Sequence, residues 1–299
     1  MRAYVTGAGG FVGSHVAAAL RDGGAEVRNE RVELTDLRAL ERAFADCEAV
    51  CHVAALYSFD AEPAEFERAN VLGTENVLRA CVAAGVRRLV HTSTAGTCGP
   101  VAGRPATEED TPPALELAVP YKRTKLAAER LVLAAATEGV DAVVVNPTAP
   151  VGEGDRKPTP TGRMVAGVAS GRIPAYVASG LNVVDVRDVA AGHALALERG
   201  RSGERYLLGG VNLTLEELFA AIARLAGRSR PRLRVPYPVT VGAAQLGLAN
   251  SDEVRLARLP MFFSSAKAER ELGYRPGPVE PALARAVAEA EARMGRAAA

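Results

Sequence analysis

The chain has few cysteines, no long hydrophobic run and no excess of charge of either sign. Its four cysteines show no C-x-x-C spacing, which argues against a disulfide framework and against a zinc or other metal site. No apolar run approaches the roughly 20 residues that cross a bilayer, so we do not expect insertion into a membrane. The 36 lysines and arginines balance 35 acidic residues, and this net charge of +1 argues against nucleic-acid binding through phosphate neutralisation.

The sequence does contain enough apolar material for a large folded unit. Hydrophobic residues make up 48% of the 299 positions, which excludes intrinsic disorder. The length fits one large α/β domain or a domain with an appendage. The chain runs directly from Met1 and Arg2 into a strand-like stretch, unlike a signal peptide. We therefore expect a soluble, cytoplasmic protein.

Short β-branched runs alternate with longer helical patterns over the first two thirds of the chain. The expected strands are Ala3–Thr6, Ala49–Val53, Arg88–Thr92 and Ala142–Asn146. The expected helices are Val12–Arg21, Leu37–Ala45, Ala64–Ala84 and Tyr121–Thr137. Strands that alternate with helices indicate right-handed crossovers and a parallel sheet buried on both faces. The predicted fold class is α/β, with a Rossmann-type, doubly wound parallel sheet.

The pattern changes after Pro147, where the chain becomes rich in proline and glycine, as is typical of a loop. A strand (Asn182–Val186), a helix (Val189–Glu198) and a strand (Arg205–Leu208) follow, and from Leu213 the chain is mostly helical. We expect a dinucleotide-binding Rossmann domain formed by residues 1–148 and 181–208, and a smaller, mostly helical substrate lid formed by residues 149–180 and 209–299.

Local signals mark several helix ends. Thr214 and Glu217 fit a capping box, in which each side chain binds a free amide at the start of a helix. We expect Asp188 to cap the helix that follows the strand at 182–186. Gly85 and Gly139 follow helical patterns, where a left-handed C-cap is favoured.

A glycine-rich turn lies between the first strand and the first helix. It has the pattern G-x-x-G-x-x-G, formed by Gly7, Gly10 and Gly13. Gly7 permits a tight turn, Gly10 lets the backbone approach a pyrophosphate, and Gly13 lets the helix pack closely on the strand. This context favours dinucleotide binding; the alternative is an ordinary glycine-rich turn. The missing G-x-x-x-x-G-K-[ST] pattern argues against an ATPase phosphate loop.

The second strand of the predicted unit is short. It begins at Ala25 and reaches Arg28, and the next helix follows almost at once. In such folds the end of this strand carries the residue that reads the 2′ position of the cofactor ribose. Arg28 favours a 2′-phosphate if it faces the cofactor, and it is a solvated strand residue otherwise. The choice between NAD and NADP stays open at this point.

Tyr121 and Lys125 lie four residues apart, on one face of a predicted helix. A phenol has a pKa of about 10 and is a poor base at neutral pH. A nearby ammonium lowers that pKa and makes the phenol a proton donor and acceptor. The alternative is a chance pairing on a solvated helix.

Hydroxyl groups follow the strand at 88–92. Ser93 and Thr94 lie at its carboxyl end, where parallel sheets form their ligand crevice, and they can donate to a substrate oxygen. The alternative is a turn that caps its own backbone. Ala54 and Ala55, after the strand at 49–53, are small enough for a flat cofactor to lie close.

Two further groups of residues have a simpler structural interpretation. His52 and His91 lie within strand patterns and are expected to be packed in the core rather than catalytic. The arginines near 199–205 and 228–234 are expected to form solvated faces, with binding of a substrate phosphate as the alternative.

Taken together, these motifs resemble the extended short-chain dehydrogenases/reductases. The matching segments are Thr6–Gly13, His52–Ala55, Asn70–Asn76, His91–Thr94, Tyr121–Lys125 and Phe262–Gly273. Within that family, Asn146–Thr148, Lys157–Gly162 and Glu204–Gly210 resemble the hopanoid-associated sugar epimerases, which are similar to dihydroflavonol-4-reductase-like enzymes. The chain departs from the family at the short second strand and at a compressed stretch, Leu246–Pro260.

The resemblance implies a set of site residues. Those implied for the cofactor are Gly7, Gly10, Phe11, Val12 and Gly13 at the pyrophosphate, Asp36 and Leu37 at the adenine, Ala54 and Ala55 along the cofactor, Pro147 and Thr148 at the nicotinamide, and Tyr121 and Lys125 at the ribose. Thr94 occupies the position of the family's catalytic hydroxyl. Tyr121 and Lys125 are the other two implied catalytic residues. Ser93, Thr94 and Tyr121 are implied to contact the substrate.

The same resemblance implies an NAD(P)-dependent oxidoreductase-type enzyme, with NADP favoured over NAD. A sugar or nucleotide-sugar epimerase is favoured, and an NADPH-dependent ketone or aldehyde reductase is the alternative. A non-catalytic NAD(P)-sensing protein is a third hypothesis, although such relatives typically lack the tyrosine or the lysine. The helices at 64–84 and 121–137 often form a four-helix dimer interface in relatives, which implies a homodimer; the alternative is that their apolar faces belong to the core of a single chain.

Overall fold

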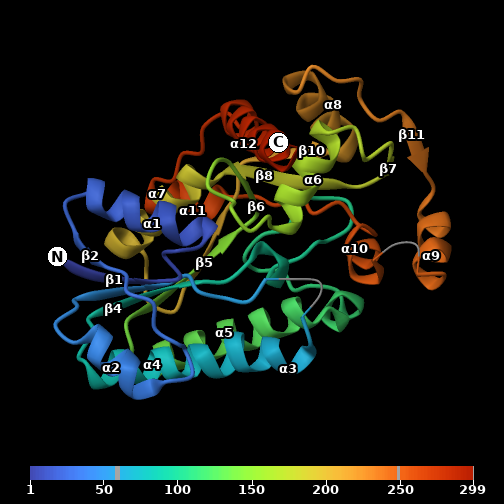
Figure 1. Ribbon diagram of the computed structural model, residues 1–299. Helices are drawn as coiled ribbons and strands as arrows, with labels where there is room; N and C mark the ends of the chain where they lie inside the picture. Colours follow the sequence, from blue (N-terminus) through green and yellow to red (C-terminus); the bar gives the residue numbers. More distant parts are fainter. Residues whose placement is uncertain (58–60, 248–249, 299) are drawn as a thin grey trace.

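The structure is a computed structural model that describes residues 1–57, 61–247 and 250–298. Its centre is a six-stranded parallel sheet in the order β2-β1-β3-β4-β5-β9 (Figure 1). The strands are β1 Arg2–Thr6, β2 Glu26–Arg28, β3 Ala49–His52, β4 Arg88–Thr92, β5 Ala142–Pro147 and β9 Arg205–Leu208. The strand order reverses between β1 and β3, and a ligand crevice is expected at such a switch point.

Helices cover both faces of this sheet (Figure 1). On one face, α1 (Phe11–Asp22), α7 (Val186–Arg199) and α11 (Ala266–Leu272) pack on the apolar side chains of the strands. On the other face, α2 (Leu37–Phe44), α4 (Gly73–Ala83) and α5 (Pro120–Thr137) do the same. Successive residues of a strand point to opposite faces, so Val90 belongs to the first core and Leu89 to the second. This burial on both faces confirms the predicted doubly wound parallel sheet.

The helix predicted over 64–84 is divided into three parts. It consists of α3 (Pro63–Phe66), a π-helical stretch (Glu67–Leu72) and α4. Within the π-helical stretch, buried Asn70 binds the backbone of Leu56, with its Oδ1 accepting from the amide at 2.7 Å and its Nδ2 donating to the carbonyl at 3.2 Å. These bonds fix the chain that follows β3. Short 3-10 helices lie at Ala95–Thr97 and Ala114–Ala118.

A second, smaller group of elements packs beside the main sheet. Its three-stranded sheet has the order β10-β8-β6, with β8 parallel to β6 and antiparallel to β10. The strands are β6 Ala149–Val151, β8 Gly180–Asp185 and β10 Val211–Thr214, and the helices packed with them are α6 Pro160–Ala169, α8 Leu215–Leu225 and α12 Glu280–Ala298. Strand β8 therefore lies outside the main sheet, although the sequence groups residues 181–208 with the Rossmann domain; β9 lies within it.

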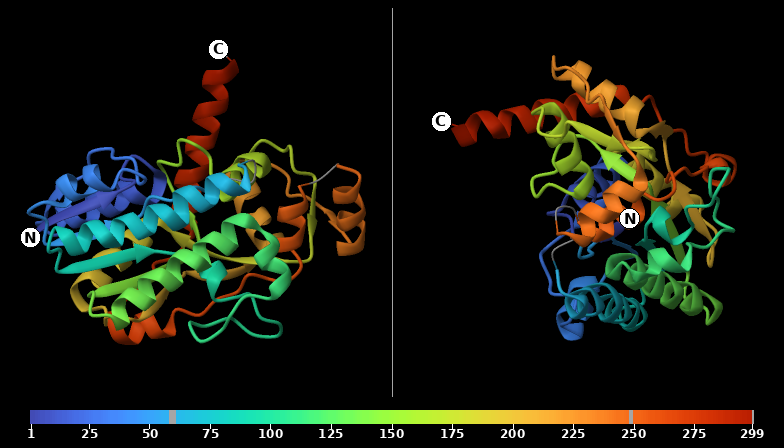
Figure 2. Two further views of the ribbon diagram at one scale, coloured as in Figure 1. Left: turned by 90° about the horizontal axis from the view of Figure 1, so that it is seen from below. Right: turned by 90° about the vertical axis from the view of Figure 1, so that its right-hand side faces the viewer.

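The remaining elements extend from the end of the molecule opposite the N-terminus (Figure 2). Strand β7 (Ala175–Val177) pairs with β11 (Leu233–Val235), and helices α9 (Tyr237–Gln245) and α10 (Ser251–Leu256) follow. Two residues of the stretch Leu246–Pro260, at 248 and 249, lie outside the described residues. Within the described ranges, no helix has both the length and the apolar character that crossing a bilayer requires.

The local signals are confirmed with one exception. Gly85 and Gly139 have φ angles of 66° and 100°, and Thr214 and Glu217 form the capping box. The prediction that Asp188 caps the next helix is wrong. Helix α7 begins at Val186, so its cap is Asp185, whose side chain accepts from the amide of Arg187 at 2.9 Å. Asp188 lies inside the first turn and accepts instead from the amide of Gly277 at 2.8 Å.

Three histidines are enclosed by the central strands. His52 bridges Thr6 Oγ1, 2.9 Å from its Nδ1, and Thr74 Oγ1, 3.1 Å from its Nε2. His193 Nε2 lies 2.9 Å from Thr92 Oγ1. His91 is fully buried, with its ring centroid 5.2 Å from that of His52. Burial lowers the pKa of His52 to about 3 and that of His193 to about 4, and it places the pKa of His91 well below its usual value. The prediction that His52 and His91 are packed in the core is confirmed.

These buried histidines should make the fold sensitive to acid. The unfolded chain protonates histidine near pH 6.5 and the folded chain does so only at a much lower pH, so the unfolded state binds more protons below about pH 6.5. The stability is therefore fully present above about pH 6.5 and is lost as the pH falls. We expect the free energy of unfolding in urea to fall by about 2 kcal/mol per histidine between about pH 7 and pH 5. His193→Gln should remove about one third of this fall, and an unchanged pH dependence in that variant would contradict the assignment.

Candidate active site

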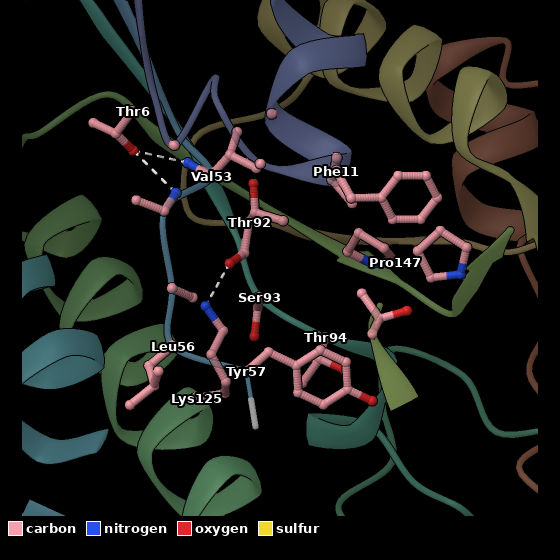
Figure 3. A pocket seen from close by; sticks show the side chains of 18 of the residues that line it. Thr6, Phe11, Val53, Leu56, Tyr57, Thr92, Ser93, Thr94, Lys125 and Pro147 are labelled. Atoms are coloured by element: carbon pink, nitrogen blue, oxygen red, sulfur yellow. Dashed lines mark hydrogen bonds between the residues drawn. The ribbon is translucent and has the colours of Figure 1, made fainter. Parts of the chain in front are cut away.

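A cavity of about 950 Å³ lies at the carboxyl ends of the central strands. Thirteen of the residues singled out in the sequence line it: Gly7, Gly10, Phe11, Val12, Gly13, Ala54, Ala55, Ser93, Thr94, Tyr121, Lys125, Pro147 and Thr148. Figure 3 shows how residues from β1, β4 and β5 and from the chain after β3 converge there. The parallel strands bring these residues together although they are up to 141 positions apart in the chain.

Two residues expected at the cofactor lie outside the cavity. Asp36 caps α2, with its Oδ1 accepting from the amide of Ala39 at 2.9 Å. Leu37 packs against the core between α2 and α4. The wall at this place is formed instead by the preceding residues, which include Arg31, Glu33 and Leu34. The reason is the short β2, after which residues 29–35 turn along the cavity before α2 begins.

The glycine turn between β1 and α1 leaves no room for side chains at Gly7 and Gly13. Gly7 has a φ of 71°, and a Cβ atom on it would lie 2.8 Å from the amide nitrogen of Ala54. A Cβ atom on Gly13 would lie 2.6 Å from the carbonyl carbon of Gly7. The amide of Gly10 donates to the carbonyl of Gly7 at 2.9 Å, which closes the turn. The start of α1 therefore approaches the cavity as bare backbone, the arrangement that binds phosphate groups at helix N-termini.

The hydroxyl of Thr6 ties this turn to the next strand. Its oxygen accepts from the amides of Val53 and Ala54 at 3.0 and 3.1 Å (Figure 3). These bonds hold the small residues after β3 against Gly7. The cavity floor is thus fixed by backbone contacts between β1 and β3, and a flat group can lie against it.

Tyr121 and Thr94 meet at the other side of the cavity. Both side chains line the cavity, and the Thr94 hydroxyl lies close enough to the phenol of Tyr121 to influence its pKa. Burial raises the pKa of Tyr121, the neighbouring Tyr57 raises it further, and the Thr94 hydroxyl partly opposes this rise. The direction is opposite to the lowering expected from a nearby lysine, because desolvation of the phenolate outweighs the effect of that hydroxyl. The phenol is therefore a proton donor in this state of the protein.

Lys125 is held in the same wall. Its Nζ donates to the carbonyl of Thr92 at 2.6 Å, and its side chain is almost fully buried (Figure 3). Burial lowers the pKa of Lys125 to about 8, and Glu129, one helical turn further along α5, acts in the opposite direction. The ammonium form of Lys125 thus prevails at neutral pH.

A buried polar network lies behind the hydroxyl of Thr94. Glu129 accepts from Thr97 Oγ1 at 2.7 Å, from Asn146 Nδ2 at 2.8 Å and from Arg205 Nη1 at 2.8 Å. Asn146 Nδ2 also lies 3.1 Å from the carbonyl oxygen of Thr94. The network connects α5, β5 and β9 to the loop after β4, and so fixes Thr94. The network could not be predicted from the sequence, because its members lie far apart in the chain.

Tyr57 is a further cavity residue that the sequence analysis missed. Its ring centroid lies 4.4 Å from that of Tyr121, with an angle of 33° between the ring planes. It lines the cavity with Leu56, directly after Ala54 and Ala55. Its place next to those two alanines is the signal that points to it. Arg31 is a second cavity residue outside the prediction. Only the course of the chain after β2 brings it to the cavity.

Two polar atoms of the cavity wall suit a bound ligand. Ser93 Oγ and Thr148 Oγ1 are buried and have no hydrogen-bond partner in the part of the chain that the structure describes. Buried hydroxyl groups are normally paired. With the bare backbone at Gly10 and Gly13, and with space of about 950 Å³, these atoms fit a dinucleotide together with a small substrate.

The arginines at 228–234 do not line this cavity among the described residues. They therefore give no support to the alternative that this cluster binds a substrate phosphate there. Across the residues that the structure describes, no group of histidine, cysteine, aspartate or glutamate side chains is arranged to hold a metal ion.

Comparison with known proteins agrees with this geometry. Residues 3–209 match the NAD dependent epimerase/dehydratase family. The chain is 37% identical to a putative dihydroflavonol 4-reductase from Synechocystis, covering 95% of this chain and 93% of that protein. Among solved structures, it is similar to a nucleoside-diphosphate-sugar epimerase from Pseudomonas aeruginosa, with 27% identity, a TM-score of 0.84 and coverage of 98% of both chains.

A second similar structure contains a cofactor. It is a dTDP-glucose 4,6-dehydratase from Streptomyces venezuelae with NAD bound, which is 26% identical to this chain. Its TM-score is 0.82, with coverage of 99% of this chain and 98% of the other. These likenesses extend over the whole described fold, and the matched family spans more than half of the sequence. The chain therefore belongs to the NAD-dependent epimerase/dehydratase family of extended short-chain dehydrogenases/reductases.

Proposed function

We propose that the chain is an NAD(P)-dependent enzyme in which Thr94, Tyr121 and Lys125 act on a hydroxyl or carbonyl group of a small molecule. The observation that carries this proposal is that the hydroxyl of Thr94, the phenol of Tyr121, the buried Lys125 and the bare backbone of the glycine turn line one cavity. A non-catalytic sensor of the cofactor would need only the glycine turn, and it leaves the paired phenol and hydroxyl unexplained.

A cofactor would be held by the backbone at Gly10 and Gly13, by Ala54 and Ala55, and near Pro147 and Thr148. Bound there, a nicotinamide dinucleotide supplies or accepts a hydride at a carbon of the substrate. Lys125 would donate to its ribose, since its ammonium lies in the wall of the same cavity as the glycine turn.

Proton transfer is the role of Tyr121. Its phenol donates a proton to the substrate oxygen during reduction and takes it back during oxidation. The Thr94 hydroxyl orients that oxygen, and the network around Glu129 holds the backbone carbonyl of Thr94. When a ligand fills the cavity and the ammonium of Lys125 approaches the phenol, that positive charge would lower the raised pKa of Tyr121.

Substrate selection is assigned to residues 149–180 and 209–299, which we propose as the lid. Asp155, Thr159, Leu256, Met261 and Phe263 from these segments line the same cavity as Tyr121. The wall that they form is part apolar and part polar. It suits a substrate that has both a polar reacting group and an apolar portion.

The favoured reaction is epimerisation of a sugar, for which the similar epimerase structure from Pseudomonas aeruginosa gives support. Reduction of a ketone or aldehyde is the second candidate, supported by the higher identity to the putative dihydroflavonol 4-reductase. Both reactions use the same proton transfer at Tyr121. They differ in whether the cofactor is regenerated on the enzyme.

A screen of cofactor-coupled turnover distinguishes these reactions. The protein is incubated with NADPH or NADH and a panel of aromatic carbonyl compounds, and with NAD or NADP and a panel of nucleotide sugars. A reductase consumes the reduced cofactor in proportion to product, which the absorbance at 340 nm reports. An epimerase interconverts the sugars without net change of that absorbance. Absence of any turnover that depends on Tyr121 would contradict the proposal.

Arg31 is the residue that we propose for cofactor choice, with NADP favoured over NAD. Its side chain is 90% exposed and lines the cavity beside the turn after β2, with Glu33 Oε1 3.4 Å from its Nη2. A guanidinium at this place suits a 2′-phosphate. Arg31→Ala should raise the KM for NADPH about tenfold and leave the KM for NADH unchanged, because an exposed charge-assisted hydrogen bond is lost.

Arg28→Ala is the matched control. Arg28 donates to the carbonyl of Ala45 at 3.2 Å and pairs with Glu30 at 3.5 Å, and it does not line the cavity among the described residues. We expect no change in either KM for this variant. A wild-type preference for NADH, or an equal effect of Arg31→Ala on both cofactors, would contradict the assignment.

A further inference from the structure

The segment 227–247 carries charge of only one sign. It contains Arg228, Arg230, Arg232 and Arg234 and no aspartate or glutamate, in a protein whose overall charges balance. All four arginines are exposed. Arg230 forms an ion pair with Glu216 at 3.2 Å, whereas the other three have no ion-pair partner within the described ranges. This run of four arginines is a concentrated positive surface.

Exposed apolar side chains lie in the same segment. Leu233, Val239 and Leu246 are 63%, 58% and 77% exposed. Helix α9 is composed mostly of apolar and small residues, yet none of its residues, Tyr237–Gln245, is buried. A surface helix normally buries its apolar face against the core. Here β11 and α9 instead stand at the end of the molecule, with α9 at its edge (Figures 1 and 2).

We propose that the segment 227–247 docks on an anionic phospholipid surface. The arginines contact the phosphate groups, and Val239 and Leu246 enter the interfacial region between headgroups and acyl chains. Basic residues beside exposed apolar side chains are the combination that binds such surfaces, since each supplies a part of the affinity. The segment has only one aromatic residue, Tyr237, so it lacks the stacking surface that single-stranded nucleic acids use.

The position of the segment links this surface to the cavity. Helix α9 contacts α10, and Leu256 of α10 lines the cavity that contains Tyr121. Docking therefore brings one wall of the cavity close to the lipid surface. The binding itself is independent of the proposed reaction, because none of the four arginines lines the cavity in the described part of the chain.

Flotation of the full chain with vesicles tests the proposal. We expect binding to phosphatidylcholine vesicles that contain about one quarter phosphatidylglycerol, and much weaker binding to phosphatidylcholine alone. The triple variant R228Q/R232Q/R234Q should bind the anionic vesicles about a hundredfold more weakly, at about fivefold for each arginine. About 1 M salt should release the wild-type protein from the vesicles, because it shortens the electrostatic screening length to roughly 3 Å. V239S/L246S should also weaken binding, but without reducing the dependence on salt.

The matched control is R38Q/R42Q/R79Q, which removes the same charge from exposed arginines of α2 and α4. It should bind vesicles like the wild type. Both arginine variants should keep the wild-type melting temperature and affinity for NADPH, which shows that they are folded. Equal losses in the two variants, or equal binding to both kinds of vesicle, would overturn the proposal. Binding to single-stranded DNA or to polyglutamate without binding to vesicles would assign the surface to another partner and would also overturn it.

Discussion

Tyr121→Phe should lower turnover by a factor of about 10² to 10⁴, the usual loss when a general acid–base group is removed. The phenyl ring keeps the contact with Tyr57, whose ring centroid lies 4.4 Å away, so the shape of the cavity is preserved. The phenol hydroxyl close to Thr94 is lost. Initial rates with wild-type and variant protein at saturating cofactor measure the effect.

Two controls separate this effect from damage to the site. The affinity of the Tyr121→Phe variant for NADPH should stay within about threefold of the wild-type value, because the contacts of the cofactor with the glycine turn are unchanged. Tyr57→Phe removes the neighbouring hydroxyl and keeps the ring stack, so its turnover should stay within about tenfold of wild type. Equal losses in the two variants would show that Tyr121 has no special role in proton transfer.

Gly13→Ala should weaken cofactor binding roughly ten- to a hundredfold. The added Cβ atom would lie 2.6 Å from the carbonyl carbon of Gly7 and 3.0 Å from the amide nitrogen of Ala8. The neighbours are backbone atoms, so relief requires the start of α1 to move away from β1, at a typical cost of 1–3 kcal/mol or about that range of affinity. Titration with NADPH, followed by fluorescence, measures the dissociation constant.

Gly9→Ala is the matched control for this variant. A Cβ atom on Gly9 meets no atom within 4 Å, although Gly9 belongs to the same turn. Its NADPH affinity should stay within about threefold of wild type. If both glycine variants bind the cofactor normally, the glycine turn is not the phosphate site. If both fail equally, the turn acts through its flexibility and not through the close approach of α1 to β1.

The main sheet was predictable because its strands and helices have different periods of apolar residues. Each predicted strand of the first two thirds is present to within one or two residues, and the parallel order then places residues such as Ala54, Thr94 and Pro147 at one edge. Strand β8 differs, because its sequence resembles that of a core strand and only its pairing with β6 and β10 shows its sheet.

Where the structure departs from the prediction, the difference follows from the exact path of the chain. Asp36 and Leu37 were transferred from relatives, and the short β2 moves the cavity wall to the residues before them. Asp188 is acidic and precedes the predicted helix start at Val189. The helix α7 begins three positions earlier, at Val186, and its N-cap is therefore Asp185.

Side-chain networks could not be predicted from spacing. Glu129, Asn146 and Arg205 belong to different elements, and only the folded sheet brings them to the back of Thr94. The raised pKa of Tyr121 has the same origin, since it follows from burial beside Tyr57 rather than from the i, i+4 spacing to Lys125.

A crystal structure of the protein with NADPH bound is the most direct test of this account. It should place the pyrophosphate against the backbone of Gly10 and Gly13, the ribose within hydrogen-bond distance of Lys125 Nζ, and the nicotinamide between Pro147 and the phenol of Tyr121. A dinucleotide bound elsewhere on the protein, or a nicotinamide far from Tyr121 and Thr94, would contradict the assignment of this cavity as the active site.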